Sequence, residues 1–405
     1  MGAGTSRHRF VRPKNRGFRP FSMPNSRWSS HTRGSADSDF GSRFESGGNS
    51  SKIRTKGRKG LKIALAVFGV LFVLIVGSGI ALAVWVSSLD ASLGFEDEAE
   101  LGRLEETLVP EPAAETEASA FYMLLLGSDA RGGEVSRSDV TMLVRIDPET
   151  TAVDLVSIPR DTMVTLGGST QKINAAYSFG GPAGAVEAVS EFAGVPISHY
   201  AEIHFEELER LVDMLGGVWV NVPEGFENSS IDVSVSAGEQ LLTGEEALVF
   251  ARERYNVSGG DFGRAQAQRI IVEAIIKQVL SLPPTELPGV IGNLADCVTT
   301  DYSVGDIVAL AQQFVGKDLT VYSAVCPSYS LSEGGVSYVC PMFDEWRDMM
   351  CRVDAGLDPN GSDAVPQAQL ENGKLGSASN SPAPREYESL AANAGLTTDD
   401  VVRSQ

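Results

Sequence analysis

The sequence lacks the short motifs that mark the common nucleotide-binding and hydrolytic folds. It contains no GxxxxGK(S/T) phosphate-binding loop, no GxGxxG after a strand-like run, no GxSxG nucleophile elbow and no HExxH zinc motif. Histidine is scarce as well, with 4 in 405 residues, and only His199 and His204 lie beyond residue 60. Both fall in one alternating, strand-like stretch, which favours structural roles. Neither a histidine-based catalytic triad nor a histidine zinc site is expected.

Charge is distributed very unevenly along the chain. The net charge is −20, yet residues 1–62 hold 15 basic and 3 acidic side chains, a charge of +12 that leaves −32 for the remainder. The acidic remainder excludes a nucleic-acid-binding body. The basic head has no nucleic-acid-binding motif, so no nucleic acid is predicted as a partner.

A long uncharged segment separates these two parts. Ile63 to Val86 contains 24 residues without a charge, and a helix of that length spans about 36 Å against a hydrocarbon core of about 30 Å. The alternatives are a buried helix or a cleaved signal peptide, for which Ala81-Leu82-Ala83 has the small-x-small form. The apolar run is longer than a typical signal-peptide core and about 60 residues precede it. We therefore predict an uncleaved transmembrane helix over residues 61–86.

The flanking charges predict the orientation and the remaining segments. Basic residues precede the apolar run and acidic residues follow it, so the positive-inside rule leaves the N-terminus in the cytoplasm and exports the rest of a single-pass membrane protein. Residues 1–60 are predicted to be a basic disordered tail facing the lipid, and residues 87–119 an acidic extended stalk. Residues 120–356 form the expected folded domain, and residues 357–405 a flexible tail with one short helix near 387–394.

The domain has the apolar periodicities of an α/β fold. Strands are predicted at 121–126, 141–146 and 153–158, and helices at 183–192, 205–215, 244–251, 263–280 and 304–315. An even number of cysteines in an exported domain favours disulfides, with free buried thiols as the alternative. Cys326 and Cys340 end two strand-like runs that we expect to be neighbours, which predicts Cys326–Cys340 and leaves Cys297–Cys351. The spacing has no CxxC pair and argues against zinc.

Arginine dominates the cations of this acidic domain. Between residues 120 and 356 there are eleven arginines and three lysines. A guanidinium stays charged and offers two parallel donors, which suits phosphate or diphosphate oxygens. Each arginine could instead pair with a surface acid. Because seven fall in four short segments at predicted strand and helix ends, we predict a shared anion site that includes Arg131, Arg137, Arg145, Arg160, Arg252, Arg254 and Arg264.

Acidic residues accompany these arginines. LLLGSDARGGEVSRSD describes a strand, a glycine-rich turn and the start of the next strand, with Asp129 and Asp139 at the two ends of the loop. Two such carboxylates suit Mg²⁺, or Mn²⁺ as the alternative, completed by water and substrate phosphates. An Asx-turn at Asp129, or a salt bridge from Asp139 to Arg137 or Arg145, is the competing interpretation. Arg160 and Asp161 follow the third strand, where ligands meet open α/β sheets.

The second half of the site is predicted at two helix ends. Thr243 and Glu246 have capping-box spacing before a short helix that ends near Arg252. Asp261 is predicted to be the N-cap of the next, long helix, which places Arg264 in the first turn and Gln268 on the same face. A helix N-terminus that carries arginine is suited to an anion. The alternative is that Asp261 only stabilises the start of the helix and takes no part in binding an anion.

These motifs together resemble the LytR-CpsA-Psr family. The resemblance rests on GSDAR, SRSDVTMLVRID, SIPRDT, KINAAYSFGG, HYAEIHFEELERLVDMLGGVWVNVP, AGEQLLTGEEALVFARERY and GGDFGRAQAQR, which occur in that order over residues 121–280. It implies a three-layer α/β/α sandwich with a central mixed sheet and an apolar pocket for a polyprenyl-pyrophosphate lipid. The implied activity is transfer of a lipid-linked glycopolymer, such as teichoic acid or capsule, onto peptidoglycan through a phosphodiester.

The resemblance also implies roles for single residues. It implies Mg²⁺ ligands at Asp129 and Asp139. The pyrophosphate and head-group contacts that it implies are Arg137, Arg160, Arg252, Arg254, Arg264, Gln268, Lys172 and Asn174, with Asp261 in support. As mechanism we expect catalytic roles for Arg160 and for one carboxylate, Asp129 or Asp161, and the arginine count adds Arg145 and Arg131 as supporting residues. The family often has an arginine where this chain has Ala267, and Arg269 lies two residues further on. A non-catalytic polymer-binding or regulatory protein and a lipid pyrophosphatase are the alternative functions.

Overall fold

The computed structural model describes residues 95, 97–111, 120–128, 138–228 and 232–385. All of them belong to the second of two compact units, Val67–Gln405. The predicted basic tail, the predicted transmembrane helix and the short helix expected near 387–394 lie outside the described residues. Among the helices that are described, none is long and apolar enough to cross a membrane.

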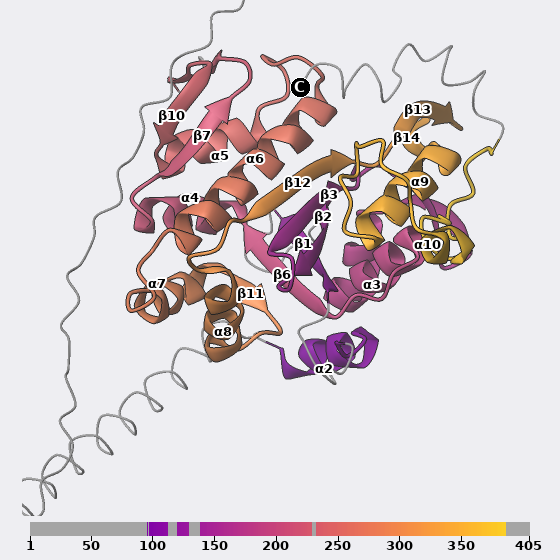
Figure 1. The fold of residues 1–405 in the computed structure, drawn as a ribbon. Helices are drawn as coiled ribbons and strands as arrows, with labels where there is room; N and C mark the ends of the chain where they lie inside the picture. The colour runs from indigo at the N-terminus through magenta and orange to yellow at the C-terminus, as the bar shows by residue number, and fades with distance from the viewer. Residues whose placement is uncertain (1–94, 96, 112–119, 129–137, 229–231, 386–405) are drawn as a thin grey trace, which may run out of the picture. The chain divides into compact units, whose positions relative to one another are not determined.

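The described part of the chain is an α/β domain built on a six-stranded mixed sheet (Figure 1). Its order is β11-β6-β1-β2-β3-β12. The parallel pairs are β1/β6 and β3/β12, and the others are antiparallel. The strands are β1 (Phe121–Ser128), β2 (Ser138–Asp147), β3 (Ala152–Ser157), β6 (His199–His204), β11 (Thr299–Thr300) and β12 (Thr320–Val325). The three strands predicted from apolar runs are therefore confirmed.

The strands of the sheet are apolar on both faces, and each face has its own core. Leu124 and Leu126 pack against α3 (Ala175–Ala193) and α9 (Phe343–Asp354). The alternate residues, such as Met123 and Leu125, pack with α6 (Asp261–Leu280) and α8 (Val304–Phe314). Successive side chains of a strand point to opposite faces, so helices cover both sides (Figure 1).

Smaller elements complete the domain, and they lie around the sheet rather than in it. They are α2 (Glu98–Thr107), β4 (Met163–Leu166), β5 (Ser169–Lys172), α4 (Phe205–Met214), β7 (Val218–Val222), β8 (Phe226–Asn228), β9 (Val233–Val235), β10 (Gly238–Leu242), α5 (Gly244–Arg252), α7 (Leu287–Leu294), the 3₁₀ turn η1 (Ala295–Cys297), β13 (Ser328–Glu333), β14 (Val336–Pro341) and α10 (Gln367–Glu371).

Of the two helix N-caps predicted beside the site, that of α5 is confirmed and that of α6 is wrong. The capping box of α5 is present, with Thr243 and Glu246 each bonding the backbone of the other. Asp261 is not the N-cap of α6. It is the first helical residue, and Gly260 precedes it with φ 56°. The Asp261 side chain is consequently available to the arginines next to it rather than to its own helix backbone.

Two predicted boundaries need correction. The acidic segment 87–119 was expected to be extended, but residues 98–107 form α2, and its Leu104 is fully buried. The tail predicted to be flexible from 357 is packed as far as residue 385, since Leu375, Ala378 and Ala383 are buried in the α3/α9 core. Amide groups of Gly376 and Ala378 also donate to the end of α3. A few small apolar residues and backbone hydrogen bonds hold this segment, and its polar composition does not reveal them.

The disulfides predicted from cysteine count do not form. All four cysteines are buried free thiols. Cys297 and Cys351 belong to different cores. Cys326 follows β12, which pairs with β3, whereas Cys340 lies in β14, which pairs with β13. The predicted pairing of the two strand-like runs was wrong, and with it the basis for Cys326–Cys340 and Cys297–Cys351.

Candidate active site

A polar cleft lies where three elements meet: the start of β2, the loop after β3 and the first turns of α6. Arg160 from the loop donates to Asp139 of β2, and Asp261 and Arg264 come from α6. The cleft is lined by Asp139, Thr141, Ser157, Ile158, Pro159, Arg160, Asp161, Asp261, Phe262, Arg264, Ala265, Gln268 and Val339. Residues more than 100 positions apart in the sequence are thus brought to one place by the sheet order.

Arg160 is the central cation of this cleft. Its pKa is raised: burial acts to lower it, but the hydrogen bond and the charge of Asp139, with Asp161 and Asp261, outweigh that effect. Its buried Nε has no hydrogen-bond partner among the described residues, and neither has the buried Oδ1 of Asn174. The backbone N–H of Asn174 donates to the backbone carbonyl of Arg160 at 3.2 Å. A free donor and a free acceptor on neighbouring residues are the pattern expected where a polar ligand completes the contacts.

Arg264 forms the second cationic wall. Its Nη2 lies 3.0 Å from Oδ1 of Asp261, and Nη1 of Arg254 lies 3.8 Å from the same oxygen. Burial lowers the pKa of Arg264, and the charges of Arg160 and Arg254 lower it further, with Asp261 acting in opposition. Arg160 and Arg254 are therefore both close enough to repel Arg264, which favours an anion beside these guanidinium groups.

The remaining predicted residues hold this arrangement together. Lys172 of β5 lies 3.2 Å from Asp161. Gln268 donates to the carbonyl of Ala251 at 3.2 Å and so ties α6 to the end of α5. Arg252, next along α5, lies over the ring of Phe205 at 5.2 Å.

Arg145 is not part of the cleft, contrary to the prediction. It points into the far end of the sheet, where its guanidinium lies 3.2 Å from Asp147 and 3.6 Å from Asp154. Asp154 is completely buried, and burial raises its pKa to about 7, with Arg145 opposing the shift. The register pairs Arg145 with Tyr122 of β1, near the start of that strand, whereas the cleft adjoins its end.

Three predicted residues, Asp129, Arg131 and Arg137, lie outside the described residues. Within the described ranges no group of three or more His, Cys, Asp or Glu could hold a metal. Asp139 nevertheless presents its carboxylate in the cleft beside Arg160. Mg²⁺ is commonly held by one or two carboxylates, with water and phosphate as the other ligands. The donor chemistry of Asp139 therefore fits a metal site that substrate would complete.

Sequence reasoning assigned no role to Arg269. This residue is 1% exposed, and its Nε donates to Ser323 at 2.7 Å and its Nη1 to Ser157 at 3.1 Å. No carboxylate of the described residues pairs with it, and burial lowers its pKa to about 10. Ser157 lines the cleft. A charged residue so deeply buried beside a polar cleft is a candidate for function.

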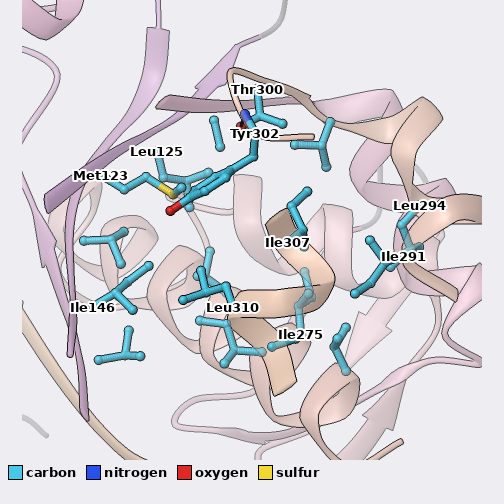
Figure 2. Close-up of a pocket in the computed structure, with 18 of the residues that line it drawn as sticks. Met123, Leu125, Ile146, Ile275, Ile291, Leu294, Thr300, Tyr302, Ile307 and Leu310 are labelled. Atoms are coloured by element: carbon cyan, nitrogen blue, oxygen red, sulfur yellow. Dashed lines mark hydrogen bonds between the residues drawn. The ribbon is translucent and has the colours of Figure 1, made fainter. Parts of the chain in front are cut away.

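An apolar cavity lies near the cleft. Its volume is about 320 Å³, and it lies between the sheet and α6, α7 and α8 (Figure 2). Met123, Leu125 and Ile146 line it from the sheet, and Ile275 and Leu310 from the helices. A smaller pocket lies between the two, because it shares Gln268 with the cleft and Leu125 and Val272 with the cavity.

Helix α6 runs along both spaces. Arg264 and Gln268 line the cleft, and Val272, Ile276 and Val279 line the cavity at three- or four-residue spacing on the same helix. From Arg264 to Val279 this stripe is about 22 Å long. The helix is thus polar at its N-terminal end and apolar along the rest of the stripe. Periodicity alone could not distinguish these apolar residues from ordinary core residues, so the cavity was not predicted residue by residue.

The chain belongs to the LytR-CpsA-Psr family, whose model matches residues 93–349. It is 30% identical over 289 residues, covering 69% of this chain and 92% of the relative, to TagU of Enterococcus faecalis, a polyisoprenyl-teichoic acid–peptidoglycan teichoic acid transferase. It is 36% identical over 261 residues to the Bacillus anthracis protein of the same name, covering 64% of this chain and 80% of the relative. The family predicted from the motifs is confirmed.

Solved structures show the same fold. The crystal structure of B. subtilis TagV is 32% identical, with a TM-score of 0.50 over 56% of this chain and 92% of TagV. An Enterococcus faecalis protein described as a transcriptional regulator is 27% identical, with a TM-score of 0.52 over 63% of this chain and 92% of that one.

Proposed function

We propose that this protein is a membrane-anchored transferase that attaches a glycopolymer carried on polyprenyl diphosphate to peptidoglycan through a phosphodiester bond. One observation carries the proposal: a cleft of arginine and carboxylate side chains continues, along one helix, into a cavity lined by aliphatic side chains. A diphosphate head joined to an isoprenoid tail matches both parts. The names of the relatives support a teichoic acid or a similar wall polymer as the cargo.

The proposal includes the topology expected from the sequence. An α/β/α sandwich outside the cytoplasm would follow a single transmembrane helix at residues 61–86, with residues 1–60 in the cytoplasm. The lipid bilayer, the lipid-linked polymer and peptidoglycan are then the three partners. Labelling of the folded domain from outside intact cells tests this arrangement, and labelling only after lysis would contradict it.

The proposed reaction is a phosphoryl transfer. A hydroxyl of peptidoglycan attacks the sugar-proximal phosphorus, a new P–O bond forms, and the bond to the bridging oxygen breaks so that polyprenyl phosphate leaves with the electron pair. The hydroxyl proton passes to a carboxylate. Asp161 lines the cleft and is our candidate, with Asp129 as the alternative. Arg160, Arg254 and Arg264 stabilise the charge on the phosphate oxygens.

Asp139 with Asp129 would hold Mg²⁺, or Mn²⁺, which supplies further positive charge to the phosphate oxygens when bound. Arg160 at present uses the Asp139 carboxylate as its partner. A cation on that carboxylate would compete with Arg160 and leave its guanidinium free for phosphate. We therefore expect metal and diphosphate to bind cooperatively.

The transfer itself is tested with the full-length protein in nanodiscs, a polyprenyl-diphosphate-linked polymer precursor and peptidoglycan fragments. Mass spectrometry measures the linked product. Arg160→Ala should reduce the rate roughly 100-fold, as loss of one electrostatic donor to a transition state does. Arg210→Ala, which removes an exposed arginine of α4, is the matched control and should be silent. If wild-type protein releases the polymer to water and forms no linked product, the protein is a lipid pyrophosphatase instead.

The cooperative binding has a readout that does not depend on activity. Calorimetry with geranyl diphosphate measures affinity with and without Mg²⁺. Wild-type protein should bind more tightly with the metal. Asp139→Asn should bind the metal-free ligand better than wild type, because Arg160 loses its competing partner, and Mg²⁺ should no longer improve binding. A variant that keeps the full Mg²⁺ effect would refute the role of Asp139.

A further inference from the structure

Two polar residues line the apolar cavity, and their polar atoms are bonded to groups outside its lining. Among the described residues that line the cavity, only Thr300 and Tyr302 have polar side chains. The Thr300 hydroxyl donates to the carbonyl of Tyr200 at 2.6 Å, and the Tyr302 hydroxyl donates to Glu111 at 3.2 Å. What they present to the cavity is therefore a methyl group and an aromatic ring (Figure 2).

Tyr302 lies at the end of the cavity remote from the cleft. The cleft adjoins Ser138 and Asp139, and Ser138 pairs with Ser128 at the end of β1. Tyr302 stacks on His199, with ring centroids 3.9 Å apart and planes at 14°, and His199 pairs with Met123 near the start of β1. Five residues of β1 separate these positions, about 17 Å of strand. Ile146 and Val153, which also line the cavity, lie two register positions beyond Met123, so a chain that enters from the cleft meets Tyr302 together with these two residues at the far end.

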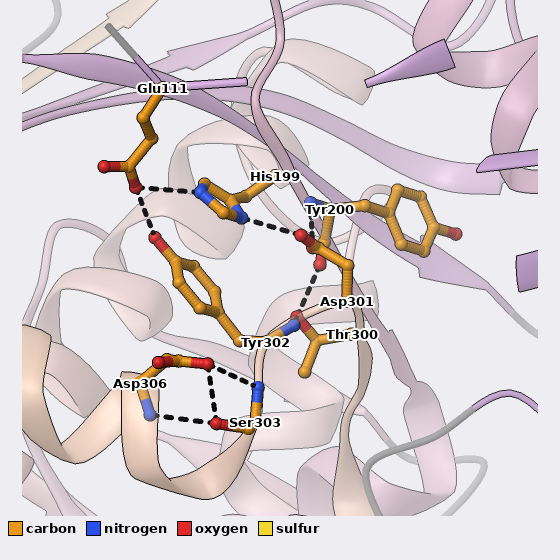
Figure 3. Close-up of polar contacts among 8 residues, drawn as sticks. All are labelled: Glu111, His199, Tyr200, Thr300, Asp301, Tyr302, Ser303 and Asp306. Atoms are coloured by element: carbon orange, nitrogen blue, oxygen red, sulfur yellow. Dashed lines mark hydrogen bonds and ion pairs between the residues drawn. The ribbon is translucent and has the colours of Figure 1, made fainter. Parts of the chain in front are cut away.

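A small polar cluster holds Tyr302 in place (Figure 3). Glu111 accepts from Tyr302 and lies 2.8 Å from Nε2 of His199, while Asp301 lies 2.7 Å from Nδ1. Burial acts to lower the pKa of His199, but Asp301 and Glu111 outweigh it and the pKa is raised. Asp301 is itself fixed by the amide of Tyr200 at 2.7 Å. The imidazole against which Tyr302 stacks is thus held from both sides.

This end of the cavity is held less firmly than the rest. Glu111 has a side chain that is 45% exposed, and exposed ion pairs and hydrogen bonds contribute little to stability. It belongs to the short segment after α2, whose Val109 amide donates to the carbonyl of Ile197 at 2.9 Å. The other walls belong to the sheet and to α6, α7 and α8. Tyr302 is therefore the part of the lining that is displaced at least cost.

We propose that Tyr302 is the displaceable part of the far wall of the cavity and determines which lipid lengths the cavity accepts, and that Glu111 and His199 determine how readily its ring moves. This inference rests on the proposed lipid-linked substrate. A cavity of about 320 Å³ is at the small end of the range for drug-sized ligands. A short isoprenoid fits within this volume. A longer one has to displace the Tyr302 ring and break its bond to Glu111.

The test compares binding of farnesyl diphosphate and heptaprenyl diphosphate to the full-length protein in nanodiscs. Tyr302→Ala should raise the affinity ratio of the long over the short lipid by about tenfold or more, since each buried methylene changes affinity roughly fourfold. Tyr302→Phe and Glu111→Gln keep a ring at the end and weaken only its attachment, so both should shift the ratio in the same direction by less. These two variants still test the proposal if Tyr302→Ala does not fold.

Leu310→Ala is the matched control. Leu310 lines the cavity from α8, so its truncation widens the cavity without opening the end and should affect both lipids alike. An unchanged ratio in Tyr302→Ala and Tyr302→Phe, or an equal shift in Leu310→Ala, would overturn the far-wall role while the proposed function stands. If wild-type protein binds neither lipid, the proposed function fails and this inference fails with it.

Discussion

Arg269 offers the most direct test of whether the cleft is built for an anion. Its guanidinium is 1% exposed and bonded to two serine hydroxyls, with no carboxylate partner among the described residues. Burial lowers its pKa to about 10, a shift that corresponds to about 3 kcal/mol against the charged form. A charge placed so unfavourably suggests a function outside the hydrophobic core.

Replacement of Arg269 by methionine distinguishes a role in stabilising the fold from a role in the transfer reaction. A buried charge without a counter-ion carries a desolvation penalty of several kcal/mol, which an apolar side chain of similar size does not carry. We expect Arg269→Met to keep or raise the free energy of unfolding. The transfer rate should fall by about 10-fold to 100-fold. Because Ser157 accepts from Arg269, its own proton is free to donate into the cleft, and such a bond to a charged ligand is worth about 1.5–3 kcal/mol.

Urea denaturation and the transfer assay measure the two effects side by side. Ser157 and Ser323 provide a matched pair, because both accept from Arg269 and only Ser157 lines the cleft. Ser157→Ala should reduce the rate and Ser323→Ala should not. If Arg269→Met loses more than about 2 kcal/mol of stability and keeps its activity, Arg269 only supports the fold and the reasoning is refuted.

Two further predictions concern the fold. The pKa of Asp154 is raised from 3.8 to about 7, so between these values the folded state holds a proton that the unfolded chain has released. The free energy of unfolding should fall as pH rises from about 4 to about 7, and Asp154→Asn should flatten that slope in urea titrations. Gly194→Ala should lower the melting temperature strongly, because φ is 71° and a Cβ would lie 1.7 Å from the Lys374 carbonyl. Gly216→Ala, at φ 76° with open space around it, should show only backbone strain of about 1–2 kcal/mol; equal losses would contradict docking of residues 374–385 on α3.

The central strands and the long helices could be predicted because their signal is local. The buried strands read as continuous apolar runs, and the capping box before α5 lies within four residues. Arg145 is a residue whose position could not be predicted from the local sequence. Its strand, β2, starts at the cleft, but Arg145 lies near the other end of that strand. Its partners are Asp147, two residues further along β2, and Asp154, opposite it on β3, and only the register reveals that it serves the opposite end of the sheet.

Segments whose stability depends on distant partners were mispredicted. The helix α2 reads as part of an acidic stalk until Leu104 is seen in the α3/α9 core, and the segment near Leu375 reads as a polar tail. The cavity was missed for a related reason. Val272 and Ile276 have the spacing of any buried helix face, and nothing in the sequence shows that the space opposite them is empty.

The carboxylate partners of the arginines also determine how positively charged the cleft is. A count of arginines suggests a strongly positive site, but Arg160 has Asp139 as partner, and Arg264 and Arg254 share Asp261. These carboxylates oppose the effects of burial and of mutual repulsion on the guanidinium groups before any ligand arrives. A diphosphate then gains only the difference between its own contacts and those that it displaces. Binding that is moderated in this way suits an enzyme that has to release polyprenyl phosphate after each transfer, because a cleft with uncompensated arginines would retain its product.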